Sequence, residues 1–100
     1  FINPPTGYWP RLARYLRSRD VLWVAEEAGA GLGRLGRDAF WSFEAHDVRP
    51  DFMTVGKTLG NGFPIGFMAC RTELAPELVR DCPPLSTALG DATLELILNH

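Results

Sequence analysis

The spacing of apolar residues along the chain predicts three helices. The first is expected over residues 6–19, where Thr6 can cap it and one face recurs at the helical interval. A last helix is expected from Ser86 for the same reason, and a short one over 73–80 behind Thr72, with a start that Pro76 weakens. The positions predicted to be buried are Trp9, Leu12, Ala13 and Leu16 in the first helix and Leu89, Ala92, Thr93, Leu96 and Ile97 in the last.

Three shorter apolar runs predict strands between these helices. They cover residues 21–25, 52–56 and 65–71, and the first is so uniformly apolar that we expect it to be buried on both faces, as in a parallel sheet. The aromatic-rich segment 37–48 is expected to be a short helix or irregular. Buried strands among helices indicate a layered α/β fold, which places its chemistry on loops at the carboxyl ends of strands.

Composition and charge narrow the class of protein further. The 100 residues are 46% hydrophobic and 22% charged, with a net charge of -2, which predicts one globular domain over 1–100 and no second domain. No basic stripe is available for nucleic acid or an anionic membrane, and no apolar run is long enough to span a bilayer. The chain begins without a methionine and ends inside an apolar run, so we expect a piece of a larger protein.

The cysteines and histidines predict no metal site. Cys70 and Cys82 are twelve residues apart, a spacing that fits neither a zinc site nor a redox pair, and His46 and His100 stand alone. No basic and apolar signal peptide is visible, and a reduced cysteine pair is typical of the cell interior. The expected location is intracellular, in the cytoplasm, with a mitochondrial location left open.

Two glycine-rich stretches look at first like nucleotide-binding loops, and neither meets the requirements. "GKT" at 56–58 lacks the upstream glycine of a P-loop, since Asp51 stands where that glycine should be. "GLGRLG" at 31–36 has the spacing of a dinucleotide loop but does not follow its strand at once or open a long helix. We interpret its glycines as allowing a sharp backbone path with positive φ, and Arg34 as a structural or interface arginine.

A carboxylate and an amine stand at the ends of two predicted strands. Glu26 and Glu27 close the first strand and Lys57 follows the second, so the two kinds of group would face one crevice. Pyridoxal phosphate needs such a pair, because a lysine binds its aldehyde and a carboxylate keeps its ring nitrogen protonated. From spacing alone, an ordinary surface lysine in a turn remains an open alternative.

Longer motifs carry a resemblance to a known family. "VLWVAEEAGAGLGRLG" and "PDFMTVGKTLGNGFP" resemble the aspartate-strand and lysine motifs of class III pyridoxal-phosphate-dependent aminotransferases. The likeness covers roughly residues 5–80 and, less clearly, 86–98. It is strongest to the alanine–glyoxylate aminotransferase 2-like branch, which also contains phosphoethanolamine-type phospholyases. The implied fold is a fragment of the large domain of a fold-type I transferase, a three-layer α/β/α structure with a mainly parallel sheet.

The resemblance also implies roles for individual residues. Lys57 would form the Schiff base with pyridoxal 5'-phosphate, Glu26 would meet the pyridine nitrogen, and Thr87 would reach the phosphate of the partner subunit's cofactor in a homodimer. The chain departs from the family at three places. Glu26 replaces an aspartate, Gly29 stands where a glutamine is usual, and the F-G-G-N-P run after the threonine is missing.

The resemblance implies an aminotransferase that moves an amino group between an amino acid or amine and a 2-oxo acid. Two alternatives stay open. One is a truncated or degenerate relative in which binding of the cofactor is weak or absent and no catalysis takes place. The other is a pyridoxal-phosphate-dependent phospho-amine lyase, which uses the same lysine chemistry.

Overall fold

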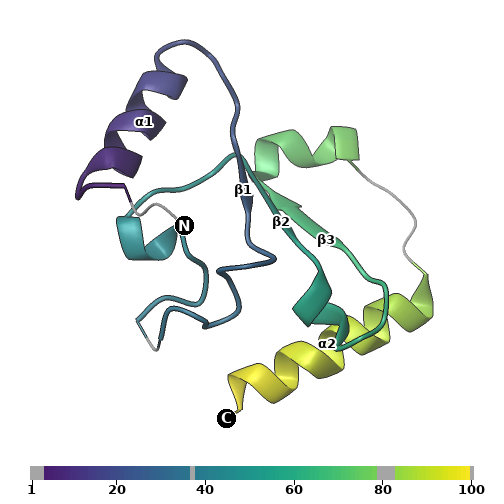
Figure 1. Cartoon of the computed structure of the whole chain (residues 1–100). Helices are drawn as coiled ribbons and strands as arrows, with labels where there is room; N and C mark the ends of the chain where they lie inside the picture. Colours follow the sequence, from purple (N-terminus) through teal and green to yellow (C-terminus); the bar gives the residue numbers. More distant parts are fainter. Residues whose placement is uncertain (1–3, 37, 79–82, 100) are drawn as a thin grey trace.

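The computed structural model describes residues 4–36, 38–78 and 83–99, which form two α-helices, three strands and three 3-10 helices (Figure 1). Helix α1 spans Tyr8–Arg17 and helix α2 spans Pro84–Leu98. The strands are β1 (Val24–Glu26), β2 (Phe52–Val55) and β3 (Phe67–Cys70). The 3-10 helices are η1 (Glu44–His46), η2 (Lys57–Gly60) and η3 (Thr72–Leu78).

The strands form one mixed sheet in the order β1-β2-β3. β1 runs parallel to β2, with Glu26 paired to Thr54, and β3 returns antiparallel, with Phe67 paired to Val55. The predicted α/β fold is confirmed, although only the β1–β2 pair is parallel in this part of the sheet. Because β1 and β2 are parallel, the loops that follow them leave from the same edge.

Helix α1 is shorter than predicted. Gly7, with a φ of 81°, is its N-cap, and no side chain caps the helix, so the cap predicted at Thr6 is wrong. Glycine takes this left-handed conformation without a steric penalty, which explains why the helix can begin directly after it. The face predicted to be buried is half-buried, and no residue of α1 is fully buried.

The prediction that the first strand is buried on both faces is wrong for this chain. β1 begins at Val24, three residues later than predicted, and Val21, Leu22 and Val24 are 47%, 52% and 55% exposed because the described residues leave them uncovered. The chain exposes 7800 Å² in total. Size scaling gives about 5,700 Å² for a compact chain of this mass, so apolar faces remain uncovered.

The two carboxyl-terminal helical segments differ from the prediction, the first in its type of helix and the second in its first residue. The segment predicted as a helix over 73–80 is the 3-10 helix η3 up to Leu78, because Pro76 inside it removes a backbone donor. Residues 79 and 80 lie outside the described part. Helix α2 begins at Pro84, two residues before the predicted start, since proline suits the first helical turn.

The face that α2 turns to the sheet is only partly the predicted one. Leu94 and Ile97 pack against the core, whereas Leu96, predicted to be buried, is 60% exposed. Gly90 is the buried residue of this helix, and the end of the Ile65 side chain lies against it. Helix α2 therefore packs against the segment after β2. The face of the helix that makes this contact differs in part from the face that periodicity alone predicts.

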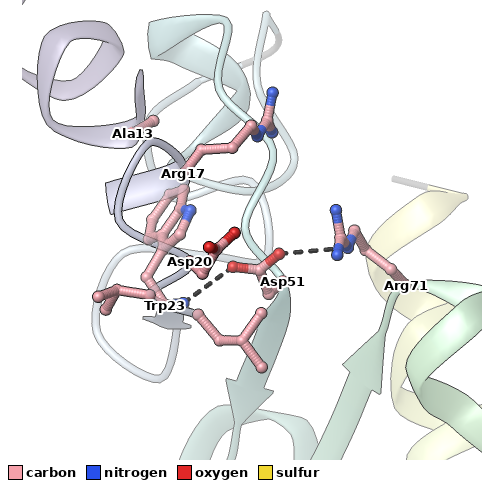
Figure 2. Close-up of a pocket in the computed structure, with 8 residues that line it drawn as sticks. Ala13, Arg17, Asp20, Trp23, Asp51 and Arg71 are labelled. Carbon is pink, nitrogen blue, oxygen red and sulfur yellow. Dashed lines mark hydrogen bonds and ion pairs between the residues drawn. The ribbon is translucent and has the colours of Figure 1, made fainter. Parts of the chain in front are cut away.

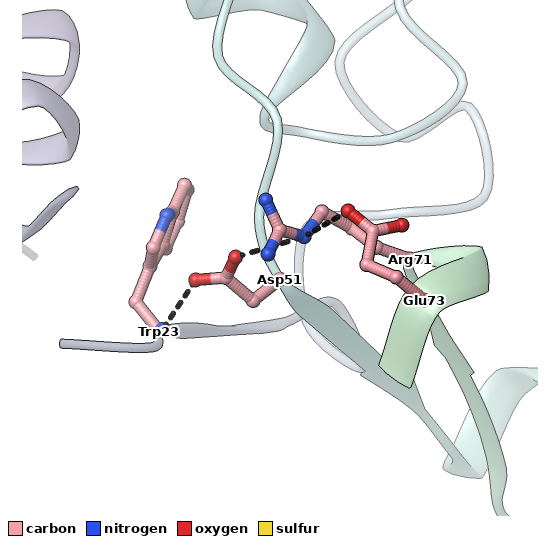
Figure 3. A network of polar contacts seen from close by, with 4 residues as sticks. All are labelled: Trp23, Asp51, Arg71 and Glu73. Carbon is pink, nitrogen blue, oxygen red and sulfur yellow. Dashed lines mark hydrogen bonds and ion pairs between the residues drawn. The ribbon is translucent and has the colours of Figure 1, made fainter. Parts of the chain in front are cut away.

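A buried aspartate links the three strands at the end of the sheet where β1 and β2 begin and β3 finishes. Asp51 is 8% exposed, and its Oδ2 accepts a hydrogen bond from the Trp23 backbone N–H at 2.9 Å (Figure 3). Its Oδ1 lies 3.2 Å from Nε of Arg71, which also approaches Glu73 at 3.4 Å. The aspartate and both arginines, Arg17 and Arg71, line a small pocket there (Figure 2). Asp51 thus fixes the start of β2 to both neighbouring strands.

The buried core lies directly beneath the loops that leave the strand ends. Leu32, Val55 and Leu59 form its centre and are 7%, 3% and 3% exposed. Partly buried side chains surround them: Phe40, Trp41, Ile65, Leu94 and Ile97. Leu32 belongs to the glycine-rich loop, whereas Val55 and Leu59 flank Lys57. The core therefore holds together the two segments for which the sequence predicts chemistry.

Candidate active site

Lys57 lies immediately beyond the end of β2, as the first residue of η2, and it is exposed. Its φ of 48° falls in the left-handed region, which costs a lysine about 1 kcal/mol or more and points to a conformation imposed by surrounding packing. Within residues 4–36, 38–78 and 83–99 its amine has no hydrogen-bond or ion-pair partner. Lys57 is also the only lysine of the chain. Its amine is therefore available to a ligand at the carboxyl end of β2.

Glu26 ends β1 at the same edge of the sheet. It is exposed, and its Oε1 accepts a hydrogen bond from the Ala28 N–H at 2.8 Å. This bond leaves Oε2 available to a ligand. Since Glu26 pairs with Thr54 in the parallel register, Lys57 follows three residues beyond that pair. The structure thus brings the predicted carboxylate and the predicted amine to adjacent strand ends.

Only the carboxylate lines the large pocket beside β1. This pocket has a volume of about 590 Å³, and Glu26 lines it together with Trp9, Leu35 and Phe43. Lys57 is not among its lining residues. The pocket is large enough for a small organic ligand, but no residue of the lysine turn lines it. The adjacency of Glu26 and Lys57 therefore rests on the strand register.

The neighbouring acid, Glu27, has a structural role that sequence reasoning did not separate from that of Glu26. Glu27 is 1% exposed, and its two carboxylate oxygens accept bonds from the Ser42 N–H at 2.8 Å and the Ser42 hydroxyl at 2.6 Å. Alternation along the strand is the signal that could have distinguished the two acids, because successive side chains point to opposite faces. Glu27 fixes the aromatic-rich segment, which follows the glycine-rich loop (residues 31–36), to the end of β1.

The tight approach of this loop to Glu27 gives a testable prediction. A Cβ added at Gly31 would lie 2.8 Å from Oε2 and 2.9 Å from Cβ of Glu27, whereas one at Gly29 would meet nothing within 4 Å. Gly31→Ala is therefore expected to lower the free energy of unfolding by about 2 kcal/mol, the usual cost of overpacking. Urea denaturation measures the change, and Gly29→Ala is the matched control. Equal stability of the two variants would contradict the packing described here.

Two of the three glycines in residues 31–36 have the left-handed conformation that the sequence predicts. Gly33 and Gly36 have φ values of 75° and 104°, which confirms the interpretation of a sharp turn. The segment after Gly56 is a 3-10 helix of four residues rather than the long helix that a P-loop requires. The glycines thus shape the backbone around Lys57 and Glu26, and neither loop has the form of a nucleotide cradle.

Thr87 lies on a different element, in the first turn of α2. It is exposed, and its hydroxyl donates to the Pro83 carbonyl at 3.3 Å. Helix α2 lies beside η2, which begins with Lys57 (Figure 1). The structure thus places the Thr87 helix against the lysine turn.

Other kinds of site find little support among the described residues. No group of three potential metal ligands occurs in residues 4–36, 38–78 and 83–99. Cys70 is a half-buried free thiol. Cys82, which was also predicted to be reduced, lies outside the described residues. His46 is an exposed residue of η1. In the part of the chain that the structure covers, no helix is both long and apolar enough to cross a bilayer.

The fold and the edge residues together indicate a class of protein. An α/β sheet with a lysine and a carboxylate at neighbouring parallel strand ends is the arrangement expected of a pyridoxal-phosphate-dependent transferase. Solved structures agree: the ornithine δ-aminotransferase of Plasmodium falciparum superposes with a TM-score of 0.83 at 27% identity. The superposition covers 98% of this chain and 27% of that one.

The sequence comparisons identify the family. The class III aminotransferase family model matches residues 1–98, and the chain belongs to this family. It is 36% identical over 104 residues to the human mitochondrial alanine–glyoxylate aminotransferase 2, covering 96% of this chain and 20% of the relative. It is 38% identical over 79 residues to ethanolamine-phosphate phospho-lyase homolog 1 of Caenorhabditis elegans, covering 77% of this chain and 17% of the relative. The chain thus spans about a fifth of the length of these relatives.

Proposed function

We propose that this chain is the lysine-bearing part of an aminotransferase that moves an amino group between an amino acid or amine and a 2-oxo acid. The observation that carries the proposal is the family match over residues 1–98, in which the only lysine stands at the end of a parallel strand. Its amine has no partner among the described residues, so it is available to a carbonyl.

The residues present fit pyridoxal 5'-phosphate. When bound, this cofactor supplies an aldehyde that takes up amines and a ring that accepts an electron pair from the substrate carbon. Lys57 would bind the aldehyde carbon, and Oε2 of Glu26, which is not engaged by Ala28, would face the ring nitrogen. Thr87 would contact the phosphate in the partner subunit of a homodimer.

Two residues of this chain would carry the proton chemistry. The Lys57 amine would act as the general base that takes a proton from the substrate α-carbon and as the general acid that returns this proton in forming the product. The Glu26 carboxylate would hold a proton on the ring nitrogen through its negative charge. Glu26 is longer by one carbon than the aspartate that the family resemblance implies, so its reach to the ring differs by about 1.5 Å.

A second candidate function is phospho-amine elimination. The observation that favours it is the 38% identity to the phospho-lyase homolog of C. elegans, close to the 36% identity to the human aminotransferase. Both reactions use the same lysine as base. A form without catalysis is the third candidate, favoured by Glu26 and Gly29 at positions where the family resemblance implies aspartate and glutamine.

Retention of pyridoxal phosphate separates these candidates from a chain that binds no cofactor. Glu26→Ala is expected to weaken retention of the cofactor about tenfold or more, the cost of removing a charged hydrogen-bond partner, whereas Glu26→Asp should keep most of it. Absorbance of the bound cofactor, measured after gel filtration, gives the retained fraction. If Glu26→Ala retains as much cofactor as the unchanged chain, the role proposed for Glu26 is wrong.

A further inference from the structure

The glycine-rich loop does more than connect β1 to the rest of the chain, because it returns to the lysine turn. Leu32, in the middle of this loop, is buried against Val55 and Leu59, the residues two positions before and after Lys57. Leu32 reaches this position with a φ of 61°, in the left-handed region. The loop that begins at Glu26 therefore packs directly beneath the segment that carries Lys57.

A polar contact reinforces this packing on the exposed side of the turn. Nη2 of Arg34, two residues beyond Leu32, donates a hydrogen bond to the hydroxyl of Thr58. The bond joins residues 24 positions apart, and Thr58 is the residue immediately after Lys57. A guanidinium donor makes such a bond stronger than one between neutral groups. Leu32 and Arg34 thus hold the segment on both sides of Lys57.

The lysine turn itself supplies few restraints of its own. Lys57 has the left-handed φ of 48°, and no side chain caps the 3-10 helix that it begins. Two backbone bonds hold it: the Leu59 N–H donates to the Gly56 carbonyl at 3.2 Å, at the upper end of the normal range, and the Asn61 N–H donates to the Thr58 carbonyl at 3.0 Å. A conformation that is rare for lysine persists only when its surroundings impose it. Helix α2 also packs against this turn, and the glycine-rich loop adds the contacts of Leu32 and Arg34.

We propose that Arg34 is a positioning residue for Lys57. Through its bond to Thr58 it sets the direction in which the Lys57 amine leaves the turn, relative to Glu26 at the end of β1. The Glu26 carboxylate then lies just before the glycine-rich loop, and the Arg34 guanidinium that orients the Lys57 amine lies near the end of this loop. The inference rests on the proposed function, because the amine must meet the cofactor at a defined place.

Substitutions at Thr58 test this inference, since they remove or keep the hydroxyl without changing a charge. Thr58→Val has nearly the same shape but cannot accept the bond, and Thr58→Ser keeps the acceptor. We expect Thr58→Val to slow covalent capture of pyridoxal phosphate by Lys57 about tenfold, and Thr58→Ser to restore it. Arg34→Met should slow capture to a similar degree, and the double variant should be no slower than either single one, because both remove the same bond.

Two measurements make the outcome decisive. The first is the rate of capture, from the mass of chains reduced with borohydride at timed intervals. The second needs no cofactor: hydrogen exchange of the Leu59 amide, which closes the turn, should speed up in Thr58→Val, whereas the Met53 amide in β2 should not change. Thr72→Val, at an exposed threonine beyond β3, is the matched control and should alter neither rate.

The possible results distinguish this inference from the proposed function. If the unchanged chain captures no cofactor, the proposed function fails, and faster exchange of Leu59 in Thr58→Val would still support the bond that orients the turn. If capture takes place and Thr58→Val captures as fast as the unchanged chain, Arg34 is not a positioning residue. Failure of Thr58→Ser to restore capture, or additive effects in the double variant, would also overturn the inference.

Discussion

Replacing Lys57 with alanine is expected to abolish covalent capture of pyridoxal phosphate by this chain. Lys57 carries the only side-chain amine among the 100 residues, so its loss removes the only side-chain amine that can capture an aldehyde. An aldehyde forms a stable reduced adduct only with such an amine. Mass spectrometry of the intact chain after borohydride reduction measures the effect, and we expect one cofactor per unchanged chain and none per variant.

Lys57→Arg serves as the matched control for this result. Arginine keeps the positive charge at the turn but does not lose its proton in proteins, so it cannot act as the nucleophile. The two variants should therefore behave alike, which separates covalent chemistry from simple attraction of the phosphate. An adduct that survives in Lys57→Ala at full yield would show that the capture takes place elsewhere.

Replacing Glu27 with alanine is expected to have the largest effect on stability. The substitution leaves the N–H of the half-buried Ser42 without an acceptor and opens a void where a side chain with 1% exposure had been. Loss of a bond to a charged acceptor and incomplete closure of the void together cost about 3–4 kcal/mol. Urea denaturation, followed by circular dichroism, measures this loss.

The neighbouring acid provides the control. Glu26→Ala removes an exposed side chain and one bond to the Ala28 N–H, so its effect on the free energy of unfolding should be about 0.5–1 kcal/mol. The two variants should thus differ clearly in their free energy of unfolding, because Glu27 supports the fold and Glu26 is proposed to bind the cofactor. Equal losses of stability in the two variants would contradict this division.

The sequence predicts those features that depend on local patterning. Residues 52–56 and 65–71 contain strands β2 and β3, because short β-branched and aromatic runs bounded by turns have few other stable forms. The glycines at 33 and 36 have the positive φ that was expected of them. The same patterning places Glu26 and Lys57 at strand ends, and the parallel register then brings these ends together.

The features that the sequence does not predict depend on long-range contacts. The residue spacing gives no sign that Ser42 binds Glu27, or that Asp51 binds the Trp23 N–H and Arg71, because each pair is far apart along the chain. The expected burial of residues 21–25 fails for a related reason. Burial of the two faces of a strand depends on the segments that pack over the sheet, and in the described part of the chain Val21, Leu22 and Val24 are left exposed.

The most direct test of the central claim is the location of the captured cofactor in the unchanged chain. The protein is incubated with pyridoxal phosphate, reduced with borohydride, digested and mapped by tandem mass spectrometry. We predict a single modified peptide that contains residues 55–64, with the cofactor on Lys57. An adduct found only outside this peptide, or the absence of any adduct, would contradict the assignment of Lys57 as the lysine that binds the cofactor.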